Sequence, residues 1–415
     1  MMSPRNLIEH FVENAPAALD LTDEVHLAQV LEWADALLLE YATLQEIDNL
    51  EAQLVAQKDQ YPLMVHLAVK LAKSKRLVAS LAHPVHVSVV FAVYQEHERI
   101  RTREENAVGE NFLIRKIGQL SWLFDDFPGF SWDMFIVDDG CPDQSGRIAQ
   151  QILAEKYDGD NVHVLFLEEA IAQQLPVTRP LRSTSESRKG GSIAYGMWYA
   201  AQANRGNHVI LFTDADLSTH LGQTGLLLDG IINLDNNAAI GSRREPASVV
   251  VKTGVRNVRG KLFIYLWKRM VHILGYITDT QCGFKAFRAE VVREIIDGLI
   301  EKKFAFDIEL LLKTDLIRHH SIEKVPIAWI DSEAASTTTA IQPYLTMLQG
   351  IAAMYHRYLS PNQESTAFAN FVDSLTEESW AELVEHVPAA IAKREPAEFD
   401  EFRDVKVADL ARILE

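Results

Sequence analysis

Short runs of apolar, mostly β-branched residues recur along the middle of the chain, and stretches with helical periodicity separate them. The apolar runs have the length of buried strands and cover residues 85–94, 133–139, 162–168, 208–216 and 238–243. Between them, apolar positions three and four residues apart predict helices over 112–124, 147–157, 193–203 and 222–234. This alternation predicts an α/β fold with a mostly parallel sheet. Ligands of such sheets bind beyond the carboxyl ends of the strands.

Two regions with helical patterns flank this alternation. Residues 1–83 carry apolar positions at helical spacing, for which a packed cap and a homo-oligomerisation hairpin are both open. The polar segment SPNQEST at 360–366 is typical of a connector, and the residues after it predict short acidic helices. We therefore expect an N-terminal helical region over 1–83, a sheet-containing domain over 84–359, and a linker with an acidic helical tail over 360–415.

The negative charge of the chain is unevenly distributed. The 415 residues carry a formal net charge of −18, to which residues 364–415 contribute −8 and residues 1–83 contribute −6. A negative protein repels phosphate backbones, so we expect no nucleic-acid partner. In contrast, residues 246–278 hold six basic side chains and no acidic one. This segment could still bind an anionic group.

Cysteine content and hydropathy favour a cytoplasmic protein. The two cysteines, Cys141 and Cys282, are too few for a disulfide framework. The N-terminus lacks the basic-then-apolar pattern of a signal peptide, and no window reaches 18 uninterrupted apolar residues. We expect a cytoplasmic location, with peripheral contact at the inner face of the membrane as an open alternative.

Acidic residues follow two of the predicted strands. Asp214 and Asp216 end the strand HVILFTDAD, and Asp138 and Asp139 end the strand that begins at residue 133. By itself a D-x-D pattern also occurs in ordinary strand-end turns. Two such clusters on one sheet edge repel each other, however, so a bound cation or a hydrogen-bonding ligand is a natural compensation. Their carboxylate oxygens suit Mg²⁺ or Mn²⁺ bridging a diphosphate.

A glycine-rich segment, Ser187-Arg188-Lys189-Gly190-Gly191-Ser192, opens the helix predicted at 193–203. Paired glycines leave backbone N–H groups accessible to a phosphate, and a helix N-terminus and Lys189 add positive potential. A flexible loop is the alternative interpretation. The spacing matches neither the P-loop nor the dinucleotide-binding pattern.

Seven segments occur in an order that resembles glycosyltransferase family 2. They are FAVYQE (91–96), VDDGCPDQS (137–145), RKGGSIAYG (188–196), FTDADLST (212–219), GSR (241–243), DTQCGFKAF (279–287) and FAFDIELL (304–311). The resemblance covers about residues 84–345 and is strongest to dolichyl-phosphate β-glucosyltransferases and polyprenyl-phosphate sugar transferases. It implies a GT-A type, Rossmann-like fold, a nucleotide-sugar donor, a divalent metal and inversion at the anomeric carbon.

The resemblance also implies roles for individual residues. On the donor side it assigns contacts with the nucleotide to Ala92, Tyr94, Glu96, Asp138, Asp139, Lys189, Gly190 and Asp214. Asp214 and Asp216 are the implied metal ligands, for Mg²⁺ or Mn²⁺. Arg243 and Asp279 are the implied catalytic residues: Arg243 would neutralise phosphate charge, and Asp279 would act as a base if the acceptor is a hydroxyl. A phosphate acceptor would need only positioning, and a structural turn Asp remains an alternative for Asp279.

The basic segment is the candidate acceptor side. Residues 252–275 combine basic side chains with Trp, Phe and Leu, a pattern typical of a helix lying on an anionic membrane. Arg256 and Arg259 are its candidate contacts with an acceptor phosphate. The alternative is a helix packed on the domain with its basic face in solvent.

These observations predict an inverting, metal-dependent transfer of a hexosyl group to a polyprenyl-phosphate-like acceptor. By family analogy alone the donor is expected to be UDP-glucose. Two alternatives stay open: the same donor chemistry on a soluble small-molecule acceptor, and a non-catalytic protein that binds nucleotide sugars. Neither the acceptor nor the oligomeric state is fixed by any local motif.

Overall fold

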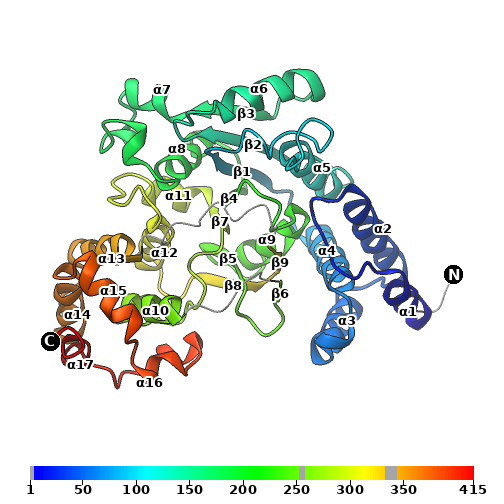
Figure 1. Ribbon diagram of the computed structural model, residues 1–415. Helices are drawn as coiled ribbons and strands as arrows, with labels where there is room; N and C mark the ends of the chain where they lie inside the picture. The colour runs from blue at the N-terminus through cyan, green and yellow to red at the C-terminus, as the bar shows by residue number, and fades with distance from the viewer. Residues whose placement is uncertain (1–3, 252–257, 332–343) are drawn as a thin grey trace.

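A seven-stranded sheet forms the centre of the computed structural model, which describes residues 4–251, 258–331 and 344–415 (Figure 1). The strand order is β3-β2-β1-β4-β7-β5-β8. The strands are β1 (His86–Val93), β2 (Ser131–Asp138), β3 (Val162–Phe166), β4 (His208–Thr213), β5 (Ala238–Ser242), β7 (Phe284–Arg288) and β8 (Ile322–Pro326). Two short strands, β6 (Val249–Val251) and β9 (Ala328–Ile330), pair separately.

Among the described strands of the large sheet, β7 alone is antiparallel to its neighbours, β4 and β5. The remaining neighbours pair in parallel. Helices cover both faces, so the predicted fold class is confirmed. All five apolar runs form strands, but β7 and β8 were not predicted. Lys285 and Arg288 interrupt the apolar pattern of β7, and Glu323 and Lys324 interrupt that of β8.

Along the chain, the helices of the central region alternate with the strands. They are α5 (Phe112–Phe124), α6 (Ser145–Lys156), α7 (Leu167–Ala172), α8 (Gly190–Ala201), α9 (Thr224–Ile232), α10 (Val258–Met270), α11 (Ala289–Ile295) and α12 (Phe306–Ile317). Alternate strand residues point to opposite faces. One face packs against α8, α11 and α12, and the other packs against α4, α5 and α9. The predicted helices at 112–124, 147–157, 193–203 and 222–234 correspond to α5, α6, α8 and α9.

The N-terminal region is helical, as predicted, with α1 (Pro4–Asn14), α2 (Glu24–Glu40), α3 (Leu44–Ala56) and α4 (Leu63–Ser80). Its apolar side chains share one hydrophobic cluster with the sheet. The buried Lys70 ammonium lies 2.7 Å from the Glu51 carboxylate and donates to the Pro326 carbonyl (3.1 Å). Because the apolar face of α2 is buried within the chain, the structure gives no support to homo-oligomerisation through these helices.

The acidic tail is also helical, with α14 (Gln363–Asp373), α15 (Glu377–Glu385), α16 (Ala389–Ala392) and α17 (Val407–Ala411) following α13 (Tyr344–Tyr358). In Figure 1 this red segment lies across the sheet from the blue N-terminal helices. Its apolar residues pack against α10 in a shared cluster. The division of the chain into three regions stays a prediction, since both flanking regions share a hydrophobic cluster with the sheet.

Helix α10 is covered by protein. Trp267 is fully buried, Lys268 donates to the Gly275 carbonyl, and Arg269 donates to the Phe399 carbonyl in the tail. The Tyr265 hydroxyl donates to the Val405 carbonyl at 2.7 Å. The predicted membrane contact through 252–275 is therefore not supported over 258–270, and 252–257 lie outside the described residues. No described helix has the length and apolar character needed to cross a membrane.

Candidate active site

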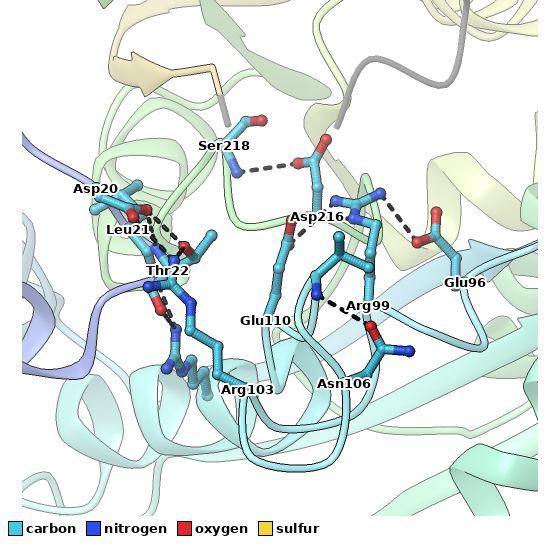
Figure 2. Close-up of polar contacts among 12 residues, drawn as sticks. Asp20, Leu21, Thr22, Glu96, Arg99, Arg103, Asn106, Glu110, Asp216 and Ser218 are labelled. Atoms are coloured by element: carbon cyan, nitrogen blue, oxygen red, sulfur yellow. Dashed lines mark hydrogen bonds and ion pairs between the residues drawn. The ribbon is translucent and has the colours of Figure 1, made fainter. Parts of the chain in front are cut away.

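The D-x-D residues follow β4 at the carboxyl edge of the sheet. Asp214 donates its backbone N–H to the Gly283 carbonyl (3.1 Å), and its carboxylate pairs with the Lys189 ammonium. Although burial raises the pKa of Asp214, the Lys189 charge holds it below its ordinary value. A Cβ at position 283 would overlap this carboxylate, so a larger residue there would displace Asp214. Oδ1 of Asp216 accepts the Ser218 backbone N–H at 3.0 Å (Figure 2).

Asp138 at the end of β2 organises its own loop. Oδ1 accepts the backbone N–H groups of Gly140 and Cys141, both at 2.9 Å, and Oδ2 accepts that of Gly146 at 2.7 Å. The side chain is buried, and both of its oxygens hold backbone groups. Its predicted contact with the nucleotide stays a prediction.

Asp139 joins this loop to the glycine-rich segment. Its carboxylate accepts the Lys189 backbone N–H at 2.9 Å and the Ser192 hydroxyl at 2.6 Å. Burial raises the pKa of Asp139. Lys189 has a positive φ of 72° directly before α8. Gly190 packs so closely on the backbone at Lys302 and Lys303 that a Cβ would overlap it. The segment is therefore held in one geometry, with the Lys189 ammonium beside Asp214.

Arg243 and Asp279 form a bidentate ion pair. Nε of Arg243 donates to Oδ2 of Asp279 and NH2 to Oδ1, both at 2.8 Å, and the Arg243 backbone N–H adds a third bond at 2.9 Å. Burial raises the pKa of Asp279, but the guanidinium outweighs it and holds the pKa far below the ordinary value. The Trp329 ring centre lies 5.2 Å from Arg243 Cζ. This geometry makes Asp279 a weak base.

The end of β1 contributes the remaining predicted donor residues. Ala92 is half-buried and Tyr94 is exposed. Glu96 donates its backbone N–H to the Ser145 hydroxyl (2.9 Å), and its carboxylate accepts from Arg99 (3.0 Å). Burial raises the pKa of Glu96 to about 7, and the negative charges of Asp216 and Asp214 act in the same direction. Glu96 thus belongs electrostatically to the D-x-D cluster.

Sequence reasoning missed the loop between β1 and α5. Arg99 donates to both oxygens of the buried Glu110 (3.0 and 3.1 Å) as well as to Glu96. In Figure 2 it lies between these two acids and next to Asp216, whereas Arg103 of the same loop reaches away to Asp20 and Thr22. The signal available in the sequence was an unusual alternation of acids and bases over residues 96–110.

Two buried lysines were missed as well. Lys116 of α5 is fully buried without a hydrogen-bond partner among the described residues, and burial lowers its pKa to about 8. Lys285 of β7 pairs with Asp307 of α12 at 3.2 Å. Both Lys285 and Asp307 occur within the family-like segments 279–287 and 304–311, where no role had been assigned to them.

The two predicted acceptor residues are not brought to this cluster. Arg256 lies outside the described residues. Arg259 lies in the first turn of α10, where its charge acts on Tyr344 of α13. Their role on the acceptor side stays a prediction.

The D-x-D carboxylates fit a divalent cation only in part. Among described residues, the single group of three metal-binding side chains with ligand atoms within 4.8 Å is Glu382, Glu385 and His386, exposed in the tail. Asp214 and Asp216 supply hard oxygen donors of the kind that Mg²⁺ and Mn²⁺ prefer. Oxygens of a diphosphate and water would have to complete the coordination.

Comparison with known proteins gives relatives of one enzyme class. No protein-family model matches the chain. The dolichyl-phosphate β-glucosyltransferase of Saccharomyces cerevisiae is 26% identical over 272 residues, which cover 62% of this chain and 70% of the relative. The undecaprenyl-phosphate mannosyltransferase of Micrococcus luteus is 29% identical over 202 residues, covering 48% of this chain and 73% of the relative.

Among solved structures, glucosyl-3-phosphoglycerate synthase from Mycobacterium tuberculosis, in complex with Mn²⁺, UDP and glucosyl-3-phosphoglycerate, is similar with a TM-score of 0.45. It is 17% identical and covers 71% of this chain and 85% of that chain. The sequence relatives are glycosyltransferases of the branch that the motifs indicated, so the resemblance is confirmed.

Proposed function

We propose that this relative of the dolichyl-phosphate β-glucosyltransferases is a metal-dependent glycosyltransferase that moves a hexosyl group to a polyprenyl-phosphate-like acceptor. The names of its sequence relatives support both the reaction and the acceptor class. UDP-glucose is the proposed donor, with inversion at the anomeric carbon. Cytoplasmic location stays part of the proposal.

The carboxyl edge supports binding of a nucleoside diphosphate. Asp139 fixes the segment that carries Lys189, and Lys189 meets Asp214. A Mg²⁺ or Mn²⁺ ion on Asp214 and Asp216 would supply Lewis-acid stabilisation of the departing diphosphate. Lys189 lies where it can add a further positive charge to that leaving group, which develops negative charge as the bond breaks.

The ion pair between Arg243 and Asp279 is the observation that carries the choice of acceptor. Three hydrogen bonds hold the Asp279 carboxylate, and a carboxylate so stabilised removes a proton poorly. A hydroxyl acceptor needs a base, whereas a phosphate monoester is already ionised at neutral pH. The pair therefore favours a phosphate acceptor. Its oxygen attacks the anomeric carbon, the carbon–oxygen bond to the diphosphate breaks, and no proton has to be removed.

Product analysis tests the proposal. The full chain is incubated with UDP-glucose and a short polyprenyl phosphate in detergent, with Mn²⁺ or with EDTA. We expect UDP release that requires the metal and acceptor, and a mass spectrum with one added hexose per lipid phosphate. Proton NMR of that product is expected to show a β-linked sugar.

Other acceptors and donors distinguish the alternatives. A soluble phosphorylated acceptor that is glycosylated while the lipid phosphate is not would contradict the lipid acceptor and keep the donor chemistry. GDP-mannose as the productive donor would contradict glucose. Tight UDP-sugar binding with no product from any acceptor would support the non-catalytic alternative.

A further inference from the structure

At the opposite edge of the sheet, where the strands begin, a row of polar side chains lies on one face. In the strand register His86 of β1 lies between Ser131 of β2 and His208 of β4, and Ser88 lies beside Asp133. Residues two apart on a strand share a face, so all five side chains point to the side of α8. Strands covered on both faces are normally apolar at such positions. Apolar packing alone does not explain this row.

Hydrogen bonds connect the row to the loop before β4. Nδ1 of His86 lies 2.8 Å from the Ser131 hydroxyl and accepts from Arg205 at 3.4 Å, which leaves the ring proton on Nε2. Nε2 of His86 in turn lies 3.1 Å from Oδ2 of Asp133. The same Oδ2 lies 3.9 Å from NH2 of Arg205, and Oδ1 of Asp133 is shielded from solvent. His86 and Arg205 therefore already pair with this carboxylate.

A cavity opens directly above this network. Its volume is about 630 Å³, and His86, Asp133 and Arg205 all line it. The turn between α5 and β2 and the start of β3 form the rest of its wall. The cavity has an aromatic wall formed by Phe124, Phe127, Phe130 and Trp132. It lies at the amino ends of the strands, away from the D-x-D residues at their carboxyl ends.

The charges around the cavity select one class of ligand. The carboxylates of Asp125, Asp133 and Asp160 line it, against one guanidinium, that of Arg205. This excess of negative charge disfavours phosphate and carboxylate ligands. A divalent metal is disfavoured too, because no three of the described acidic or histidine side chains here bring ligand atoms within 4.8 Å of one another. Aromatic faces beside carboxylates are the surroundings that organic ammonium ions prefer.

We propose that this cavity binds a small organic cation of the alkylammonium class. The ammonium group lies beside the carboxylates of Asp125 and Asp160 at the rim, and the alkyl part lies against the aromatic wall. The negative charge of these two carboxylates attracts the cation. This site is independent of the proposed transfer reaction.

Calorimetric titration of the full chain tests the proposal. The probes are tetramethylammonium chloride and n-butylammonium chloride, each against NaCl of equal ionic strength. We expect saturable binding with one site, and about tenfold weaker binding to the Asp125→Asn/Asp160→Asn double variant, since two nearby carboxylates are neutralised. Asp126→Asn is the matched control, because Asp126 follows Asp125 but does not line the cavity. Its affinity is expected to stay within about twofold.

Three results would overturn the inference. The first is the absence of saturable binding of both probes up to about 50 mM. The second is an equal loss of affinity in Asp126→Asn, which would indicate unspecific attraction to a negative surface. The third is saturable binding of inorganic phosphate that Arg205→Gln abolishes, which would make this an anion site. The Phe130→Leu variant tests the aromatic wall separately. We expect it to bind tetramethylammonium about threefold more weakly. Unchanged binding would contradict the proposed contact with the aromatic wall.

Discussion

The two ends of the parallel strands bury charged groups in different ways. At the carboxyl edge, Asp214 and Asp279 lie in loops, and basic residues from other segments neutralise them, as Lys189 does for Asp214 and Arg243 for Asp279. At the amino edge, polar residues such as His86 and Asp133 lie within the strands themselves and pair with one another across the sheet.

This difference predicts how each edge responds to a ligand or to a substitution. Loop residues at the carboxyl edge can be substituted without breaking the backbone hydrogen bonds of the strands, because those bonds do not depend on them. Strand residues at the amino edge are fixed by the sheet register, so a ligand there meets a preformed arrangement. We expect substitutions at the carboxyl edge to change catalysis most, and substitutions at the amino edge to change stability.

The largest expected effect is at Asp216. Asp216→Asn removes one implied metal ligand, and we expect the rate of UDP release to fall at least about 100-fold with little change in melting temperature. Initial rates over a Mn²⁺ series measure this. Asp126→Asn, an exposed neutralisation at the other edge, serves as the control and is expected to keep the rate. Full activity of Asp216→Asn would contradict metal binding at the carboxyl edge.

The next effect is at Arg243. Lys cannot reproduce the two parallel hydrogen bonds to Asp279, so we expect Arg243→Lys to lower kcat/KM about 10- to 100-fold, mostly through KM for the acceptor. Steady-state kinetics with varied acceptor measure the split. An equal loss in KM for the nucleotide sugar would place the pair on the donor side instead.

From the raised pKa of Glu96 we expect its contribution to folding stability to fall as pH rises. Its folded pKa of about 7 lies above the ordinary value of 4.5, so the folded state binds more protons between these values and loses up to about 3 kcal/mol as pH rises through them. Melting temperatures of the wild type and Glu96→Gln from pH 4.5 to 7 test this. We expect the difference between them to shift against the wild type; a constant difference would contradict the raised pKa.

From the lowered pKa of His208, at the amino edge, we expect the opposite dependence of folding stability on pH. Burial lowers its pKa to about 4 from 6.5, so the unfolded state binds more protons between these values. Stability then rises by about 2 kcal/mol as pH increases from 4 to 6.5. His208→Gln, measured over this range by melting temperature, is expected to lose that rise. If the stability attributed to His208 fell with rising pH, as expected for Glu96, this difference between the two edges would be contradicted.

The smallest effect is expected at Arg103. It donates to Asp20 and Thr22 and ties the loop after β1 to the N-terminal helices, but both charged partners are about half exposed. Arg103→Ala is expected to cost about 0.5–1 kcal/mol, and high salt should reduce the cost. Melting temperatures at low and high NaCl measure it. A large loss of activity would show that this tie positions Arg99.

Short local patterns in the sequence placed Lys189, Asp214 and Asp216 at the ends of elements, and their roles stay a prediction. Asp214 and Asp216 follow an apolar run, and Lys189 precedes a helix, so short patterns identify them. The partners were not predictable in this way. Arg99 meets Glu110 through a loop without periodicity, and the bidentate bond of Arg243 to Asp279 joins residues 36 apart.

At the amino edge no local pattern exists at all. His86, Asp133 and His208 belong to three strands, and each appears singly among apolar residues. Only the strand register brings them together. The covering of α10 by the tail was hidden for the same reason, because the acidic tail helices that pack against Tyr265 begin about a hundred residues later in the chain.

The antiparallel strand β7 sets the order in which the sheet can be completed during synthesis. The strands β3, β2, β1 and β4 are adjacent in the sheet and are all available once residue 213 has left the ribosome. β5 follows soon after, yet its neighbours β7 and β8 appear only at residues 284–288 and 322–326. For some 40 residues of synthesis β5 has no partner on either side, which at roughly 5–20 residues per second lasts seconds. The nascent chain therefore exposes an unpaired apolar strand, a target for chaperones, just when half of its sheet is already built.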